Sequence, residues 1–373
     1  MRPLEAHKDL HAAKGCRMVS FMKSTAAPDF SLTRAMHARW NRVGRRLAFK
    51  ARTAAEWRAW RRRLLAELKS LTGYDTLRPC TLQPRVDART DRGDHWRERV
   101  VIRTEADVYM PFYVLIPKTG AGPFPAVLCP HGHCGGGKTS TSGEREADPR
   151  MPGIIDQYNY DYGVQFARAG AIAFCPDARG FGERRYAGHP DLLDCTCRLT
   201  HNMAIPLGLT ITAQWAWDLH RLLDYAATRR DCLPGRIGCA GLSGGGLQAL
   251  WASALDTRIR AAVISGYFYG YRESLLDQPE NCSCNYVPHL YETADMGDIG
   301  ALILPRPVLI ETGTVDPLNG ASGLKNVRSQ VAILKRAASL LNAPEAVAHD
   351  VFEGDHKWHG TVSVPWMMKQ LAR

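Results

Sequence analysis

The stretch that decides the fold is Arg236 to Leu255, which reads RIGCAGLSGGGLQALWASAL. A short apolar run meets Gly241-Leu242-Ser243-Gly244-Gly245 with no spacer, and an Ala-rich segment suited to a helix follows. A strand, a sharp turn and a helix are the setting in which G-x-S-x-G is a nucleophile elbow. The serine sits in a strained turn, so the residues two before and two after it must lack a Cβ. We therefore predict that Ser243 is a nucleophile and not part of a merely flexible turn.

The segments around this stretch alternate between strand patterns and helix patterns. Residues 82–118 read as two or three antiparallel strands joined at residues 92–94, and solid apolar strands follow at 123–130, 171–184, 261–266, 307–312 and 349–353. Helical patterns occupy residues 31–72, 158–169, 210–228, 325–341 and 362–371. Solid apolar strands between amphipathic helices indicate a parallel sheet that is covered on both faces. The order predicts an α/β protein with the α/β-hydrolase fold: a mostly parallel central sheet, helices on both faces and an N-terminal helical extension.

The positive charge of the chain is concentrated at its N-terminus. Residues 1–72 hold 17 Lys and Arg against 5 Asp and Glu, whereas the whole chain holds 48 against 37. We predict a basic helical extension at 1–72 and a catalytic domain at 73–373, with insertions at about 185–209 and 267–304. Residues 1 to about 30 lack periodicity and are expected to be loosely ordered. Tryptophans and leucines at helical spacing over 31–72 favour helices that pack on the main domain over a nucleic-acid-binding or membrane-surface helix.

The sequence also bears on where the protein resides. No apolar run approaches the ~18 residues that span a bilayer, and the N-terminus has no apolar core of a signal peptide. Both observations predict a cytoplasmic protein without a transmembrane segment. Cys129, Cys175 and Cys239 lie in apolar strand-like runs, where a buried thiol acts as a small hydrophobic group.

Two Cys-x-Cys pairs fall in the predicted insertions. They are Cys195 with Cys197 and Cys282 with Cys284, and both are expected near the carboxyl edge of the sheet. Four thiolates are able to bind zinc, but the spacing differs from the commoner C-x2-C. Unpaired thiols or one pair that clamps a loop are therefore favoured over a metal, which would be structural. The sequence does not decide among these arrangements.

A serine nucleophile needs a base, and the base needs an orienting carboxylate. In this fold the order along the chain is serine, acid, histidine, each at the carboxyl end of a strand. The strand PVLIETGT is followed by Asp316, and the strand HDVFEG is followed by His356. We therefore predict a triad of Ser243, Asp316 and His356, although Asp316 before a proline is also a residue typical of turns.

The base and the acid each have a competitor nearby. His359 lies three residues after His356, but His356 follows the strand end directly, and His359 is expected to start or pack the last helix. Glu353 and Asp355 are alternative carboxylates. Their adjacency to His356 in the sequence places them poorly for holding the far nitrogen of its ring.

The oxyanion of an acyl-transfer reaction needs two N–H donors in a site that excludes water. Gly244 supplies one from its backbone, and the loop His131-Gly132-His133 is expected to supply the other from the backbone of His133. The two imidazoles also suit zinc, but the glycine-rich loop is better explained as a donor loop. The run ending in Lys138 lacks the spacing of a phosphate-binding loop. No metal and no cofactor is therefore expected.

With these residues in hand, the chain resembles the acetyl xylan esterase and dienelactone hydrolase-like branch of the α/β-hydrolases. The motifs that carry the resemblance are PHGHCGGGK at 130–138, PDARGFGER at 176–184, RIGCAGLSGGG at 236–246, PRPVLIETGTVDP at 305–317 and FEGDHKWHG at 352–360. They span about residue 100 to the C-terminus. The resemblance implies the same triad, and it implies that residues 177–182 shape the carboxyl edge of the sheet beside the site.

The prediction is a serine hydrolase that cleaves carboxylic esters through an acyl-enzyme, with short-acyl (acetyl) esters of carbohydrates or similar small esters as substrates. No nucleic-acid partner is expected, and the sequence does not indicate an oligomeric state. One alternative is a serine peptidase of the prolyl-oligopeptidase kind, although the chain lacks a propeller-sized gating domain. Another is a non-catalytic protein that binds an anionic polymer or a membrane through its basic N-terminus.

Overall fold

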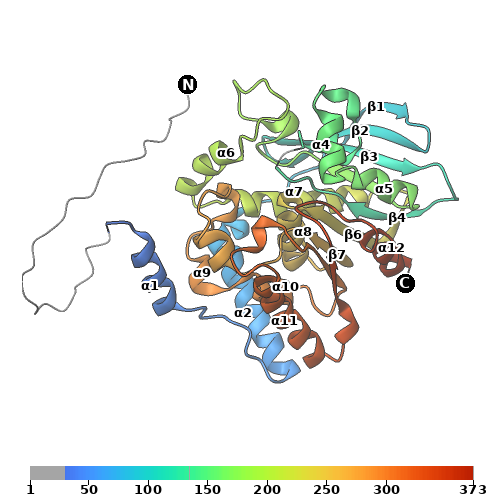
Figure 1. The fold of residues 1–373 in the computed structure, drawn as a ribbon. Helices are drawn as coiled ribbons and strands as arrows, with labels where there is room; N and C mark the ends of the chain where they lie inside the picture. Colours follow the sequence, from blue (N-terminus) through green and yellow to red (C-terminus); the bar gives the residue numbers. More distant parts are fainter. Residues whose placement is uncertain (1–29, 134, 373) are drawn as a thin grey trace, which may run out of the picture.

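A nine-stranded mixed sheet runs through the protein, and helices cover both of its faces (Figure 1). The computed structural model describes residues 30–133 and 135–372. The strands are β1 (Arg85–Asp91), β2 (His95–Glu105), β3 (Val108–Pro117), β4 (Phe124–Leu128), β5 (Ile172–Pro176), β6 (Cys232–Leu242), β7 (Ala261–Ser265), β8 (Val308–Gly313) and β9 (Val347–Phe352).

The strand order places the elbow strand at the middle of the parallel part of the sheet. The order is β1-β2-β3-β5-β4-β6-β7-β8-β9. The pairs β1–β2, β2–β3 and β3–β5 are antiparallel, and all remaining pairs are parallel. The predicted α/β-hydrolase fold and its antiparallel entry are confirmed. Because β4, β6, β7, β8 and β9 are parallel, the loops after them meet at one edge, where the candidate residues lie.

The larger helices are α1 (Thr33–Val43), α2 (Ala54–Thr72), α4 (Met151–Tyr158), α5 (Tyr162–Arg168), α6 (Cys197–Ala204), α7 (Ile211–Ala226), α8 (Gly244–Leu255), α10 (Met296–Ala301), α11 (Leu324–Leu340) and α12 (Ser363–Ala372). Shorter helices are α3 (Lys138–Thr141) and α9 (Leu290–Thr293). Across the described ranges, no helix has the length and apolarity that crossing a membrane requires.

Side chains on the two faces of the strands belong to two separate hydrophobic cores. Leu128 of β4 and Phe174 of β5 point into one core, which contains α2, α7, α8, α10 and α11. Val127 and Cys175 point into the other, which contains α4, α5 and α12. Cys129, Cys175 and Cys239 are completely buried in these cores, as predicted for thiols that act as small hydrophobic groups.

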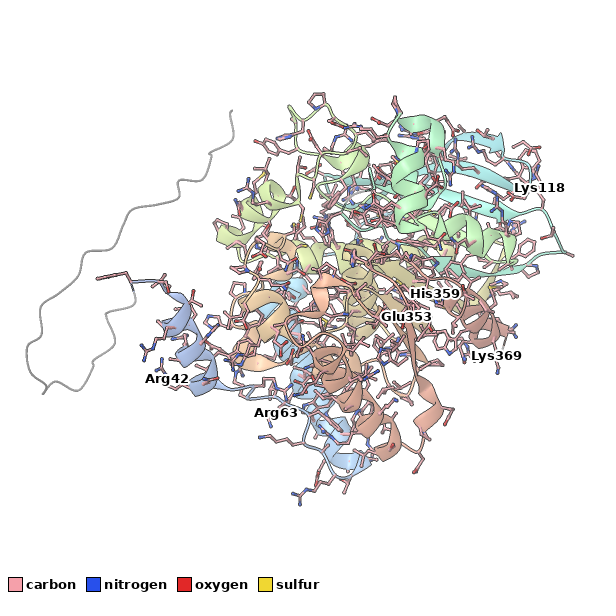
Figure 2. All side chains as sticks on the ribbon, viewed as in Figure 1. Arg42, Arg63, Lys118, Glu353, His359 and Lys369 are labelled. Carbon is pink, nitrogen blue, oxygen red and sulfur yellow. The ribbon has the colours of Figure 1, made fainter. Side chains whose placement is uncertain are left out.

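The N-terminal helices differ in how they meet the body. In α2 the side chains of Trp57, Leu64 and Leu68 are buried in the larger core. In α1 no side chain is buried. Arg42 of α1 and Arg63 of α2 are exposed at the periphery of the molecule (Figure 2). Helix α2 therefore packs on the main domain with Arg63 in water, as expected, whereas α1 buries none of its side chains. The expectation for residues 1 to about 30 falls, up to residue 29, outside the described residues.

The two insertions contain more regular structure than the sequence pattern predicts. The segment 185–209 includes α6, and the segment 267–304 includes α9 and α10. Helix α10 begins with a capping box in which the carboxylates of Asp295 and Asp298 accept backbone N–H groups. The helices are short and lie in polar sequence, so they show no periodicity that a window of 11–18 residues detects. The insertion at 267–304 is therefore helical in part.

Candidate active site

Ser243 occupies the sharp turn between β6 and α8. Its backbone has φ 59° and ψ −120°, a conformation that a residue with a side chain seldom adopts. The Ser243 N–H donates to the Ser265 carbonyl at 2.9 Å, which ties the turn to the end of β7. Strain of this kind persists only where the surrounding structure imposes it, and it is concentrated at functional sites. The strand-turn-helix setting expected of a nucleophile elbow is thus present.

The glycines on either side of Ser243 permit the close approach of strand and helix. A Cβ on Gly241 would lie 2.5 Å from the carbonyl group of Gly245. A Cβ on Gly245 would lie 2.1 Å from the Pro130 carbonyl oxygen, which belongs to the loop after β4. Neither distance is compatible with a side chain. The motif therefore requires glycine at both positions for packing, as the sequence predicts.

Asp316 and His356 are brought together from the ends of β8 and β9. The His356 Nδ1 lies 2.7 Å from Oδ2 of Asp316. The other carboxylate oxygen of Asp316 accepts the Leu318 N–H at 2.9 Å, and its side chain is buried. With its Nδ1–H donated to a carboxylate, a neutral imidazole keeps Nε2 free to accept a proton.

Ser243 and His356 line the same small cavity, of about 40 Å³, together with Tyr158 and Tyr160. The His356 ring also lies against the turn after β7. A Cβ on Gly266 would be 2.9 Å from its Cε1, so a larger residue at this position would displace the ring. The three predicted triad residues therefore meet at the carboxyl edge of the sheet, although they are far apart in the sequence.

The competing residues have other partners. His359 Nδ1 lies 2.8 Å from Oδ2 of Asp350, and its ring stacks on Phe352 with the centroids 4.6 Å apart. Glu353 accepts the Thr314 hydroxyl at 3.2 Å. Figure 2 labels both His359 and Glu353 near the end of β9. The structure therefore places His356, and not His359, beside Ser243 and Asp316.

The loop after β4 lies directly over the elbow. A Cβ on Gly132 would be 3.1 Å from the Ser243 Cβ, and a Cβ on Gly244 would be 2.7 Å from Nδ1 of His133. Gly244 is the first residue of α8, where backbone N–H groups have no partner within the helix. The loop and the helix start are thus adjacent to the nucleophile. That the backbones of His133 and Gly244 hold the oxyanion stays a prediction.

Buried polar contacts fix this loop. His131 is buried, its Nε2 accepts the Ala178 N–H at 3.0 Å, and its Nδ1 lies 2.6 Å from the Gly132 carbonyl. Burial lowers the pKa of His131 to about 4, so its ring is neutral at neutral pH. Lys138 forms a buried ion pair with Asp177 at 2.8 Å. His131 and Asp177 therefore join the stretch at 177–182 to the loop, in agreement with the expectation that this stretch shapes the edge.

A second, larger cavity of about 270 Å³ opens beside Ser243. Its walls include Tyr267 and Tyr269 from the turn after β7, and Asn281, Cys282 and Asn285 from the second insertion. Sequence reasoning placed Cys282 of this insertion over the sheet edge but did not identify the other four wall residues. The sequence feature that could have indicated this wall is the run Tyr-Phe-Tyr directly after an apolar strand.

Glu311 of β8 is a further residue that the sequence analysis missed. Its buried carboxylate accepts the Ser265 and Ser363 hydroxyls at 2.7 and 2.6 Å. It also accepts the N–H groups of His359 at 2.8 Å and Gly360 at 3.2 Å. Burial raises the pKa of Glu311, and the four donors oppose this shift. Glu311 thus links the ends of β7 and β8 to the loop that carries His356.

Comparisons with known proteins agree with this architecture. No family model matches the sequence. A protein of Bacillus subtilis strain 168 named "Putative hydrolase YtaP" is 28% identical over 249 residues, which are 65% of this chain and 77% of that protein.

Solved structures extend the similarity to nearly the whole chain. A "putative acetyl xylan esterase" from Bacteroides fragilis superposes with a TM-score of 0.76 at 19% identity, covering 93% of this chain and 97% of that one. A glucuronoyl esterase from Solibacter usitatus gives a TM-score of 0.65 at 17% identity, covering 87% and 96%. The resemblance inferred from the motifs is confirmed at the level of the fold: the chain has the α/β-hydrolase fold in the form that these esterase structures share.

Proposed function

We propose that the protein is a serine hydrolase of carboxylic esters, with short-acyl esters of carbohydrates or similar small esters as its substrates. The observation that carries the proposal is the strained Ser243 at an elbow, beside His356, whose Nδ1 lies 2.7 Å from the Asp316 carboxylate. The names of the related structures support the ester as the bond that is cleaved.

In this proposal the Ser243 hydroxyl attacks the acyl carbonyl carbon while His356 Nε2 accepts the hydroxyl proton. Asp316 holds Nδ1–H and stabilises the imidazolium that forms. The backbone N–H groups of Gly244 and His133 hold the oxyanion of the tetrahedral intermediate. His356 then returns its proton to the leaving alcohol, which departs and leaves an acyl-enzyme. A water molecule, deprotonated by His356, then attacks the acyl carbonyl carbon. The bond to Ser243 Oγ breaks, His356 returns the proton to that oxygen, and the acid is released.

The cavity beside Ser243 favours a small, uncharged group. Its volume of about 270 Å³ is at or below the lower end of the usual range for ligand pockets, and Tyr267 and Tyr269 form part of its wall. Glu280 is among the residues that line it, and none of those residues is an Arg or a Lys. An anionic group placed there would meet a carboxylate without a compensating cation. Acetyl esters are therefore preferred over long-chain acyl esters and over esters of dicarboxylic acids.

The test compares hydrolysis of p-nitrophenyl acetate, butyrate and octanoate by the wild type and by Ser243→Ala. We expect the wild type to prefer acetate, and the variant to stay folded while losing ~10³-fold or more of kcat/KM. Circular dichroism and thermal unfolding report whether the variant is folded. Equal activity of the folded variant and the wild type would refute Ser243 as the nucleophile.

A further inference from the structure

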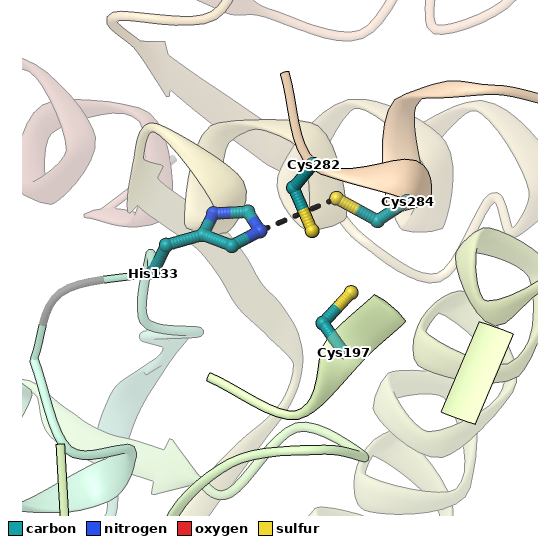
Figure 3. A group of neighbouring side chains, drawn as sticks. All are labelled: His133, Cys197, Cys282 and Cys284. Carbon is teal, nitrogen blue, oxygen red and sulfur yellow. Dashed lines mark hydrogen bonds between the residues drawn. The ribbon is translucent and has the colours of Figure 1, made fainter. Parts of the chain in front are cut away.

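One imidazole and three thiols converge beside the elbow. The side chains are those of His133, Cys197, Cys282 and Cys284, and one ligand atom from each lies within 4.8 Å of all the others. Figure 3 shows the three sulfur atoms and the His133 ring directed toward a common space. The His133 Nε2 lies 3.3 Å from the Cys284 sulfur. The two predicted Cys-x-Cys pairs thus meet, with Cys195 exposed at the side of the cluster.

The four side chains come from three segments that are held in place by other contacts. His133 lies on the loop after β4, and Cys197 begins α6. Cys282 directly precedes the short 3-10 turn Ser283–Asn285 of the second insertion, and Cys284 lies within it. The backbone of Cys197 packs closely on Gly180. A Cβ on Gly180 would lie 2.8 Å from the Cα of Cys197. The Cys284 carbonyl accepts the Thr212 hydroxyl at 2.6 Å. The cluster is therefore built into the fold.

Burial makes this grouping chemically unusual. Cys197 and Cys284 are completely buried, and Cys282 and His133 are half-buried. Thiols are weak hydrogen-bond donors and acceptors, so they gain little by facing one another. The thiolate is the form of cysteine that binds metals, and a cation placed among these sulfur atoms would stabilise it.

We propose that His133 Nε2 and the thiolates of Cys197, Cys282 and Cys284 bind one zinc ion. Three thiolates and one imidazole are a donor set that structural zinc sites use, in tetrahedral geometry. Zn–S bonds of roughly 2.3 Å and Zn–N bonds of roughly 2.0 Å place the ligand atoms of a tetrahedron about 3.5–3.8 Å apart. Binding of Zn²⁺ to three thiols and a neutral imidazole releases three protons to water, and no redox partner is needed.

The surroundings of the cluster suit a bound metal. The Asn285 amide nitrogen lies 3.7 Å from the Cys284 sulfur, a contact that would stabilise a thiolate. His201, one turn after Cys197 on α6, is buried, and among the described residues its Nδ1 has no hydrogen-bond partner. A disulfide between two of the thiols would leave the third thiol and the imidazole without a function. The C-x-C spacing does not argue against this zinc site, because its ligands come from three segments and not from two C-x-C pairs alone.

The zinc ion would act as a structural link to the active site. His133 connects the two, because its Nε2 faces the thiols while its Nδ1 lies over Gly244 at the start of α8. An ion held at Nε2 fixes the ring, and with it the loop whose backbone N–H is the proposed oxyanion donor. The ion itself does not depend on the proposed function, whereas this effect on turnover does.

The first experiment measures zinc in the full chain, purified without an affinity tag or chelator, by inductively coupled plasma mass spectrometry. We expect about one zinc per chain in the wild type and a loss of most of it in Cys282→Ser. Cys195→Ser is the matched control, because Cys195 belongs to the same pair as Cys197 but lies outside the ligand set. It should keep its zinc. Retention of zinc by Cys282→Ser, or loss of it only in Cys195→Ser, would overturn the assignment.

A second measurement does not depend on whether the variants fold. Wild-type protein that is stripped of metal and reloaded with Co²⁺ should show thiolate-to-cobalt charge transfer and the intense visible bands of a tetrahedral site. Wild-type protein that takes up neither zinc nor Co²⁺ refutes the site. An intact mass two hydrogens below that of the reduced chain, with no metal bound, would instead establish a disulfide and also refute it.

The two proposals fail in distinguishable ways. Ser243→Ala should bind zinc as the wild type does while it loses esterase activity, because Ser243 supplies no ligand. Cys282→Ser should lose zinc and show a kcat lowered by ~10- to 100-fold, with its triad still labelled by a fluorophosphonate probe. Zinc without any Ser243-dependent hydrolysis would refute the proposed function alone. Ser243-dependent hydrolysis by a protein that binds no metal would refute the zinc site alone.

Discussion

The triad residues and the thiol cluster lie on either side of His133, yet different parts of the fold position them. Ser243, Asp316 and His356 each follow a strand of the parallel sheet, so ladder hydrogen bonds fix the start of every turn. The three cysteines of the cluster lie in the two insertions, and His133 lies in a glycine-rich loop. One site is positioned by the sheet, and the other by contacts between loops.

This difference determines how each site should respond to mutation. In the proposed mechanism, removing a triad side chain removes a chemical step while the sheet keeps its geometry. Removing a ligand of the proposed zinc site removes a cross-link between segments that other contacts already hold in place, so the effect reaches the active site only through the position of His133. We therefore expect the larger losses of turnover, with little loss of stability, from variants on the sheet side, and smaller losses of turnover, together with loss of zinc, from variants on the cluster side.

The largest effect in this comparison is expected from the two histidines after β9. Both have an aspartate partner, at 2.7 Å for His356 and 2.8 Å for His359. Only His356 shares a cavity with Ser243. We expect His356→Gln to lower kcat/KM for p-nitrophenyl acetate by ~10³-fold or more, because the base is lost.

His359→Gln is the matched control for that variant. It should lower kcat/KM by less than about tenfold, through a small displacement of the loop. Thermal unfolding of both variants checks that each is folded. A larger loss for His359→Gln than for His356→Gln would exchange the roles of the two residues.

Glu311 provides an intermediate effect, because it supports the loop of His356 without reaching the cavity of Ser243. Glutamine at this position has the same size but places an NH₂ group against hydroxyl and N–H donors. We expect Glu311→Gln to lower kcat by about tenfold with KM nearly unchanged. Titration of active sites with a fluorophosphonate separates a lower turnover from a smaller folded fraction. A full loss that the titration attributes to unfolding would make Glu311 a purely structural residue.

The sheet side was largely predictable from the sequence. Strand, turn and helix patterns are local, and the parallel sheet then brings Ser243, Asp316 and His356 to one edge. The cluster was not predictable in this way. Cys197 and Cys284 are 87 positions apart in segments without periodicity, and their meeting depends on how two insertions fold over the edge. The donors to Glu311 likewise come from two distant segments, the end of β7 and residues 359–363, so no spacing rule identifies them.

The smallest effect concerns His131, which joins the donor loop to the stretch at 177–182. Burial lowers its pKa from 6.5 to about 4, and Asp177, His133 and Lys138 are the charged or titratable groups that act on it. The unfolded chain therefore binds a proton at a higher pH than the folded protein does. The free energy of unfolding falls as the pH drops from about 6.5 to about 4, by at most ~1.4 kcal/mol per pH unit from this residue.

His131→Gln should flatten that dependence, because its amide oxygen is able to accept the Ala178 N–H and does not titrate. Urea unfolding of both proteins between pH 7 and pH 4 measures how steeply the free energy of unfolding depends on pH in each. Burial also lowers the pKa of His349 to about 4, but His349 is present in both proteins, so its contribution cancels in the comparison. Equal slopes in the two proteins would mean that His131 is protonated in the folded state without cost. The Ala178 N–H would then have another acceptor, and the loop after β4 would be held by its other contacts, which include the Lys138–Asp177 ion pair and the hydrogen bond from Gln248 to the His131 carbonyl.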